Sequence, residues 1–210
     1  MLRDIRKQYT FSALTEEEVS KYPFVQFEIW LKAAIDSTEP EPTAMVLSTV
    51  DKELQPHSRV VLLKDCFDEG LVFFTNYRSN KAIEISYNCR VAVLFFWESL
   101  ERQVRITGKA GKIPDKVSDE YFHCRPADSR LGAWASEQSA VIPSAEHLHE
   151  RFLHFQQQFG ENIPRPPHWG GYLIRPESFE FWQGRPDRLH DRLLYQKQAD
   201  GLWEIRRLAP

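Results

Sequence analysis

The sequence has few cysteines and no long apolar run. Cys66, Cys89 and Cys124 lie far apart and form no CxxC pair, which argues against a disulfide framework or a zinc site and fits a reducing cytoplasm. The longest apolar run, residues 91–97, is far too short to span a bilayer, and residues 1–7 contain no apolar stretch of signal-peptide length. We therefore expect a cytoplasmic protein that neither enters a membrane nor is exported.

The sequence also lacks a strong excess of either charge. It carries 27 basic and 30 acidic residues, a formal net charge of -3, and these are spread along the chain. No general basic field favours nucleic acid, so any anion-binding site must be local. The glycine-rich patterns GxGxxG and GxxxxGK are absent, as is the strand–helix alternation typical of dinucleotide-binding domains.

Length and composition favour a single domain over residues 1–210, because 42% hydrophobic residues can fill one sizeable core. Near the N-terminus, residues 15–18 resemble a capping box. Pro23 then opens a stretch that predicts a helix with one buried face, since its apolar residues recur at helical spacing. These residues are Phe24, Phe27, Leu31 and Ile35.

From residue 43 the pattern changes to β. Branched and aromatic runs separated by turn-like residues predict hairpin-connected strands. They cover residues 44–50, 59–64, 71–75, 90–97 and 103–113. Gly108 and Gly111 predict a bend or bulge in the last of these. Helices are expected at 114–124, around 132–134 and at 147–159, and strands return from Tyr172. The sequence thus predicts a mainly β, α+β fold with about six or seven antiparallel strands in a barrel and peripheral helices.

A cluster of charge near the C-terminus is the first candidate site. If residues 188–192 are extended, Arg188, His190 and Arg192 share one face, and two guanidiniums flank an imidazole. Such a pair is costly without an anion, so a phosphorylated ligand would suit it. Spacing alone leaves open a solvated surface strand with Asp187 and Asp191 as counter-ions. Aromatic residues at 179–182 could likewise serve a flat ring or the ordinary core.

Two further cationic groups lie upstream. Arg59 and Lys64 are five residues apart, which places them on opposite faces of a regular strand. They could serve two different anions, or one of them could be a solvated edge residue. Residues 78–81 open a helix after a strand, where free backbone N–H groups and the helix dipole favour an anion.

Metal and hydrolase sites have little support in the sequence. His147, His149 and His154 do not share a helical face, so no metal site is predicted. Ser136 and Ser139 lack the glycines of a nucleophile elbow.

Taken in order, several segments resemble the pyridoxamine 5'-phosphate oxidase family, FMN enzymes of vitamin B6 metabolism with a split-barrel fold. The resemblance covers most of the chain. The matching segments are residues 59–64, 73–76, 100–104, 121–126, 132–134, 169–171, 181–184, 188–192 and 207–210. Any one segment alone would be weak; their common order makes the resemblance specific.

The resemblance implies a set of site residues. Contacts to FMN are implied for Arg59, Val60, Val61, Leu62, Leu63, Lys64, Phe74, Thr75, Asn80, Lys81, Gln103, Gln138, Ser139, Trp182 and Arg192. Contacts to substrate are implied for Arg6, Tyr9, Lys64, Tyr121, Arg125, Ser129, Arg188, Leu189 and His190, with Arg188 and His190 at the reacting end. Residues 1–20 would form a mobile arm over the active site. At Asn80 the family pattern leads us to expect an arginine, so the FMN phosphate would be one charge short unless Arg78 compensates.

The implied reaction is oxidation of pyridoxamine or pyridoxine 5'-phosphate by O2, giving pyridoxal 5'-phosphate and hydrogen peroxide. The resemblance also implies a homodimer with FMN at its interface. Two alternatives remain at this point: a flavin oxidase of the same fold with another substrate, and a non-catalytic protein that binds FMN or pyridoxal phosphate.

Overall fold

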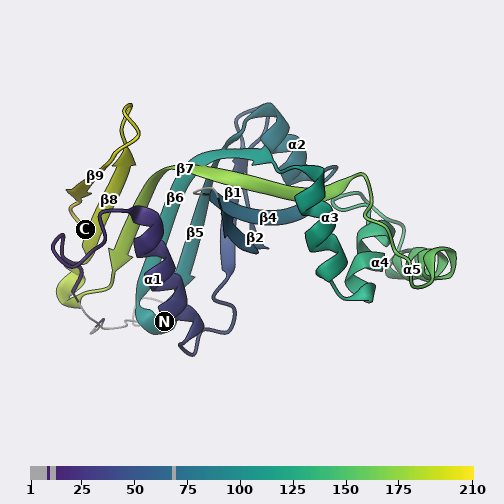
Figure 1. The fold of residues 1–210 in the computed structure, drawn as a ribbon, viewed down its shortest axis with the longest axis horizontal. Helices are drawn as coiled ribbons and strands as arrows, with labels where there is room; N and C mark the ends of the chain where they lie inside the picture. Colours follow the sequence, from purple (N-terminus) through teal and green to yellow (C-terminus); the bar gives the residue numbers. More distant parts are fainter. Residues whose placement is uncertain (1–8, 10–12, 68–69) are drawn as a thin grey trace, which may run out of the picture.

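Antiparallel strands form one curled sheet, with helices around it and at one end (Figure 1). The structure is a computed structural model that describes residues 9, 13–67 and 70–210. Nine strands in these residues form one sheet, ordered β2-β1-β5-β6-β7-β4-β3, with β8 beside β7 and β9 beside β8. They are β1 (Ala44–Val50), β2 (Pro56–Leu62), β3 (Asp65–Phe67), β4 (Gly70–Asn76), β5 (Arg90–Trp97), β6 (Arg102–Lys112), β7 (Trp169–Gln183), β8 (Asp191–Lys197) and β9 (Trp203–Arg207).

Strand β7 spans the molecule and links its two ends. Its 15 residues pair with β6 along its length, with β4 through its first half and with β8 through its second half. The β6–β7 register shifts between Thr107 and Gly108, which confirms the predicted bulge. A Cβ atom on Gly108 would lie 2.2 Å from the carbonyl oxygen of Arg175, so only glycine fits there without rearrangement.

Helix α1 (Pro23–Ile35) covers the inner side of the curled sheet and closes the main core. The Phe27 ring lies 5.1 Å from that of Phe95, and the Trp30 ring lies 5.2 Å from that of Phe181. The prediction that Ile35 belongs to the buried face is wrong, because Ile35 is 55% exposed. Ala34 takes that place, since Phe27, Trp30 and Ala34 follow the helical period more closely.

Residues 15–18 form a turn and do not begin a helix. The Thr15 hydroxyl donates to Glu18 Oε2 at 2.9 Å, so the two side chains of the predicted capping box do meet. The helix nevertheless starts only at Pro23, because the chain bends at residues 19, 21 and 22.

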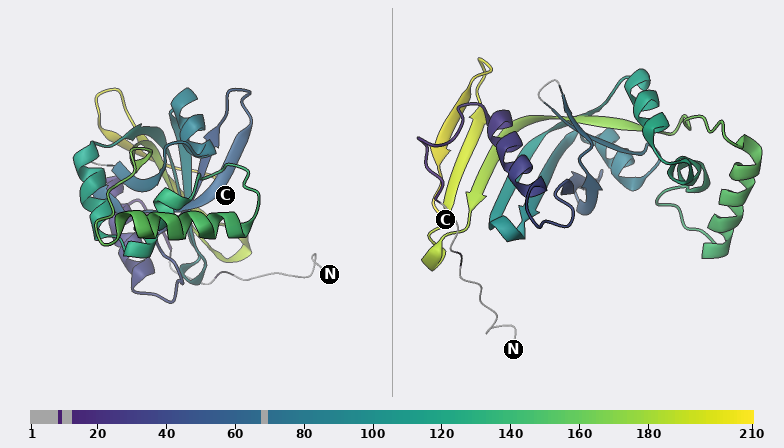
Figure 2. Two further views of the ribbon diagram at one scale, coloured as in Figure 1. Left: turned by 90° about the vertical axis from the view of Figure 1, so that its right-hand side faces the viewer. Right: turned by 60° about the horizontal axis from the view of Figure 1, so that its bottom comes forward.

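The remaining helices lie away from α1. Helix α2 (Asn80–Tyr87) follows β4, and α3 (Asp115–Cys124), α4 (Ala127–Ala135) and α5 (Ala145–Phe159) gather at one end. The β8–β9 hairpin lies at the opposite end (Figure 2). All three helical segments predicted between residues 114 and 159 are therefore confirmed. No helix within the described residues is long and apolar enough to cross a membrane.

The two glycines of β6 provide a test of the bulge. Gly108→Ala should lower the free energy of unfolding by about 2 kcal/mol, because the new methyl group overlaps the backbone of β7. Gly111→Ala is the matched control, since a Cβ atom there meets nothing within 4 Å. Urea unfolding of both variants gives the two values. Equal losses at the two positions would contradict the close approach at Gly108.

Candidate active site

A cavity of about 700 Å³ lies between strands β2 and β4 and helices α3 and α4. It collects most of the side chains for which the sequence implied ligand contacts. Those in its lining are Arg59, Val60, Val61, Leu62, Lys64, Phe74, Thr75, Lys81, Tyr121, Arg125, Ser129 and Gln138. Its size is typical of sites for small molecules and cofactors.

The lining is cationic, and no acidic side chain of the described residues contributes to it. Arg59, Lys64, Lys81 and Arg125 all reach the cavity. Lys81 is buried, its Nζ donates to Thr75 Oγ1 at 3.2 Å, and its pKa is lowered by burial and by the charge of Arg59. Four cations around one cavity in a protein of net charge -3 mark a local anion site.

The prediction that Arg59 and Lys64 lie on opposite faces is wrong. Strand β2 ends at Leu62, and the chain turns before β3 begins at Asp65. The alternation of a regular strand therefore does not extend to Lys64, whose backbone N–H donates to Val72 O at 2.8 Å. Both cations line the same cavity.

An aromatic wall faces these cations. The rings of Phe74 and Tyr121 stack with centroids 3.9 Å apart, and Phe74 also stacks on Trp169 at 5.3 Å. The Arg125 guanidinium lies 4.7 Å from the centre of the Trp169 ring. The Nη1 atom of Arg125 is buried without a hydrogen-bond partner, and burial lowers the pKa of the Arg125 guanidinium. A buried guanidinium nitrogen without an acceptor is costly, so this atom favours an anionic ligand in the cavity.

The second group of expected residues lies elsewhere. The Tyr9 ring packs edge-on against Trp182 at 5.6 Å and His190 at 5.5 Å, and Trp182 and His190 are 4.7 Å apart. None of the three lines the cavity. Trp182 lies thirteen positions after the cavity residue Trp169 on β7, which is roughly 40 Å along an extended strand. Within one chain, the cavity and the group formed by Tyr9, Trp182 and His190 therefore lie at opposite ends of β7.

The prediction that Arg188, His190 and Arg192 share one face of an extended strand is wrong. A 3-10 turn covers Pro186–Arg188, and Asp187 and Arg188 have positive φ values of 56° and 63°. Strand β8 starts only at Asp191. Arg192 donates to Glu180 Oε1 at 2.8 Å, so its charge already has a carboxylate partner.

Other expected residues take varied positions. Gln103 is the cross-strand partner of Trp182, Leu189 is 70% exposed, and Leu63 is buried in the main core. Arg6, like most of the expected arm, lies outside the described residues.

Asn80 lies at the first turn of α2 and is exposed. Its backbone N–H donates to Ser139 Oγ at 3.2 Å, and neither residue lines the cavity. Arg78 is also exposed and outside the lining, and its charge acts on His168. The structure thus gives no support to compensation by Arg78.

Some cavity residues carried no role in the sequence interpretation. They are Asn76, Gly132, Ala133, Ser136 and Trp169. Four of them, Asn76, Gly132, Ala133 and Trp169, belong to segments that carried the family resemblance, which was the available signal. Ser136 was considered only as a nucleophile.

His190 has a defined tautomer. The backbone N–H of Arg185 donates to His190 Nδ1 at 3.1 Å, so in the neutral ring the proton lies on Nε2. Burial and then the charge of Arg188 lower the pKa of His190. Both effects favour a neutral imidazole that presents an N–H donor at physiological pH.

An NMR titration tests this state. The ¹⁵N shifts of His190 should report the Nε2–H tautomer, with a pKa below about 6.5, the ordinary value for histidine. Arg188→Gln should raise the pKa because one of the two causes of its lowering is removed. A neutral ring protonated on Nδ1, or a pKa above 6.5, would contradict the assignment.

Comparison with known proteins agrees with this geometry. Residues 31–159 match the family model described as pyridoxamine 5'-phosphate oxidase, and residues 169–210 match that of the pyridoxine 5'-phosphate oxidase C-terminal dimerisation region. The chain is 52% identical over 211 positions to the pyridoxine/pyridoxamine 5'-phosphate oxidases of Burkholderia mallei and Burkholderia thailandensis, covering 100% of this chain and 99% of each relative.

Solved structures show the same fold. PhzG from Burkholderia lata, in complex with tetrahydrophenazine-1-carboxylic acid, has a TM-score of 0.89 at 27% identity and covers 95% of this chain and 99% of its own. An FMN-binding, pyridoxamine 5'-phosphate oxidase-related protein from Nostoc punctiforme has a TM-score of 0.74 at 17% identity, covering 91% and 100%. The predicted mainly β split barrel with peripheral helices is confirmed, and the chain belongs to the pyridoxamine 5'-phosphate oxidase family.

Proposed function

We propose that this protein binds FMN and oxidises pyridoxamine 5'-phosphate and pyridoxine 5'-phosphate with O2, releasing pyridoxal 5'-phosphate and hydrogen peroxide. With the amine substrate, water hydrolyses the imine that is formed and ammonia is released. The observation that carries the proposal is the cavity itself, in which four cations face a wall of stacked aromatic rings. Two phosphorylated ring compounds, a cofactor and a substrate, require this combination of charge and flat apolar surface. The names of the 52% identical relatives support the same reaction.

The residues at the β2–α2 side of the cavity fit FMN. Arg59 and Lys81 would bind its phosphate, together with the hydroxyl of Thr75, and the backbone of residues 60–62 would lie along the flavin. Gln138 Oε1 accepts hydrogen bonds from Thr75 Oγ1 at 3.0 Å and Asn76 N at 3.3 Å, which holds its amide group in place. When bound, FMN would supply the redox chemistry by accepting a hydride and passing electrons to O2.

The opposite side of the cavity fits the phosphate of the substrate. Lys64, Arg125, Tyr121 and Ser129 line the cavity and would bind this phosphate, and the unpartnered Nη1 of Arg125 is the donor in need of an acceptor. Burial raises the pKa of Tyr121, so its hydroxyl stays protonated and can donate a hydrogen bond.

A second copy of the chain would complete the site. The Trp182–His190 group cannot reach the cavity of its own chain, given its distance along β7. At the edge of the cavity, the sheet carries Val60, Val46 and Leu94 in one cross-strand row, and Val60 is 65% exposed. Pairing of two such faces about a twofold axis would cover this apolar surface and bring each group to the partner's cavity.

Arg188 and His190 would then orient the reacting end of the substrate. The Nε2–H of neutral His190 can donate to the amine nitrogen or alcohol oxygen on C4', while Arg188 supplies a fixed positive charge. Their contribution is to hold C4' in position for hydride loss. Neither residue is required as a base in this scheme, because a neutral amine can lose a hydride directly.

A different substrate is the main alternative. PhzG, similar at 27% identity, was crystallised with a phenazine carboxylic acid, which carries no phosphate. The set of Lys64, Tyr121, Arg125 and Ser129 favours a phosphorylated substrate, since it places two cations beside a hydroxyl-lined aromatic wall.

The reaction can be measured directly. FMN-loaded protein in air should convert pyridoxamine 5'-phosphate with release of peroxide, and dephosphorylated pyridoxamine should have a much lower kcat/KM. His190→Ala and Arg188→Ala should each lower kcat/KM by about 100-fold through lost orientation. His149→Ala, on the exposed surface of α5, is the control. Near-wild-type kcat/KM in both site variants would show that the reacting end has been misplaced.

Mixing two inactive variants tests whether the site is shared. Arg125→Ala removes a cavity residue and His190→Ala a residue of the other group, so both homodimers should be nearly inactive. After subunit exchange in equal amounts, half of the dimers are mixed and each contains one intact site. Activity should return to roughly a quarter of the wild-type value. If each chain used its own two groups, the mixture would stay inactive.

A further inference from the structure

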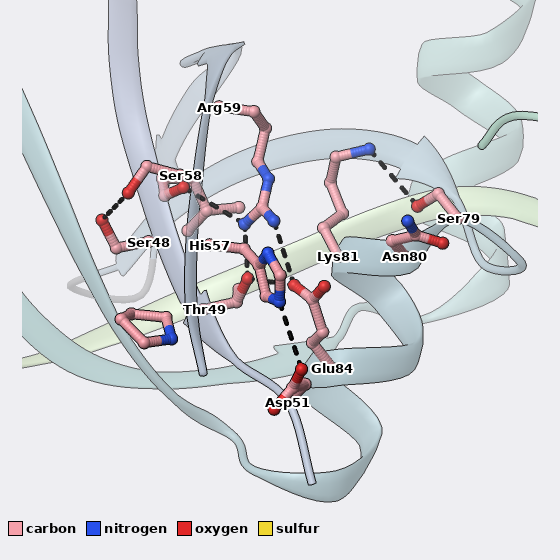
Figure 3. Close-up of polar contacts among 12 residues, drawn as sticks. Ser48, Thr49, Asp51, His57, Ser58, Arg59, Ser79, Asn80, Lys81 and Glu84 are labelled. Atoms are coloured by element: carbon pink, nitrogen blue, oxygen red, sulfur yellow. Dashed lines mark hydrogen bonds and ion pairs between the residues drawn. The ribbon is translucent and has the colours of Figure 1, made fainter. Parts of the chain in front are cut away.

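A buried carboxylate lies directly behind Arg59. Glu84 Oε2 accepts a hydrogen bond from Arg59 Nη2 at 3.0 Å and another from the hydroxyl of Thr49, which in turn accepts from Arg59 Nη1. The side chain of Glu84 is only 8% exposed and that of Arg59 only 22%. Figure 3 shows the carboxylate and the guanidinium directed toward each other, with Thr49 beside them.

Glu84 does not face the large cavity. Arg59 and Lys81 line that cavity, whereas Glu84 lines a separate hollow of about 230 Å³ together with Asn80 and Tyr87. The guanidinium of Arg59 therefore stands between Glu84 and any anion in the cavity. A cavity ligand would interact with Glu84 through charge and not through contact.

The same carboxylate acts on Lys81. The two residues are three positions apart on α2 and are both buried on it. The Lys81 ammonium donates to the hydroxyls of Thr75 and Ser79 and has no ion pair among the described residues. Burial and Arg59 lower the pKa of Lys81, and Glu84 is the group that raises it.

The buried Lys81 and the partly buried Arg59 need a counter-ion in the absence of ligand. A phosphate group would supply it when bound, and Glu84 supplies it when the cavity is empty. The bound phosphate and the Glu84 carboxylate would both be negative and would lie on opposite sides of one guanidinium. Each therefore reduces the electrostatic stabilisation that the other gains from the two cations.

We propose that Glu84 is an internal counter-ion of the anion site: it stabilises the empty cavity and, by the same charge, lowers the affinity of the cavity for phosphate groups. The proposal rests on the proposed function in taking the phosphate of FMN as the anion that binds beside Arg59 and Lys81. Glu84 would thus set both the affinity for the cofactor and the stability of the protein when no cofactor is bound.

The test compares FMN with riboflavin, which lacks the phosphate. Glu84→Gln keeps the volume of the side chain and an acceptor for Arg59 but removes the charge. Calorimetric titration of the apoprotein should give an FMN Kd about tenfold lower than in wild type. This is the size of effect expected when a unit charge is removed from the far side of the Arg59 guanidinium. The Kd for riboflavin should not change. The Tm of the apoprotein should fall, and the rise in Tm caused by FMN should become larger.

Two further variants serve as controls. Glu84→Asp retains the charge and should keep an FMN Kd close to the wild-type value. Glu177→Gln removes a carboxylate that pairs with Arg90 and Lys109 outside the cavity, and should change neither the Kd nor the effect of FMN on Tm.

Each outcome bears on the proposal. An unchanged or weaker FMN affinity in Glu84→Gln would overturn it and indicate that Glu84 only positions Arg59. If Glu84→Gln does not fold in phosphate-free buffer, inorganic phosphate should restore folding, and failure to do so would also overturn it. If wild-type protein does not bind FMN, the proposed function fails, and titration with inorganic phosphate still tests Glu84 through the same tenfold difference.

Discussion

The length and pairing of strand β7 constrain everything else in this structure. Trp169 at its start belongs to the wall of the cationic cavity, and Trp182 near its end packs against His190. Continuous pairing with β6 holds the two ends apart, and the bulge at Gly108 only bends the strand. A chain built this way cannot fold its C-terminal cluster back onto its own cavity. The separation is therefore the physical reason for expecting a site composed from two copies of the chain.

Several arginine side chains already have carboxylate partners within the fold. Glu84 pairs with Arg59, and Glu180 accepts from both Arg105 and Arg192, at 2.9 and 2.8 Å. An arginine with such a partner is held in one orientation and does not depend on a ligand for its counter-charge. Arg125 differs, since its Nη1 has no partner. The cations around the cavity are thus not equivalent, because Arg59 already has a carboxylate partner whereas Arg125 has a buried nitrogen that still requires an acceptor.

Local patterns failed where the chain reverses. The faces predicted for Arg59 and Lys64, and for Arg188 to Arg192, assumed regular strands, but a turn after Leu62 and positive φ angles at Asp187 and Arg188 interrupt them. Neither the turn after Leu62 nor the segment at Asp187 and Arg188 contains a glycine. The residue types therefore gave no indication that the strands end there. Such backbone geometry in non-glycine residues is maintained by the surrounding tertiary structure.

The sequence by itself determined the class of fold, the order of strands and helices, the bulge in β6 and, through ordered segments, the family. These depend on short-range periodicity, on glycine and proline, and on the identity of side chains, all of which can be observed in one dimension. Only the tertiary structure decided that Arg59 and Lys64 face one cavity, that Arg192 is paired with Glu180, and that Glu84 lies behind Arg59. Those contacts join residues from different strands and helices, and burial and charge compensation depend on distances in space, which spacing along the chain does not specify.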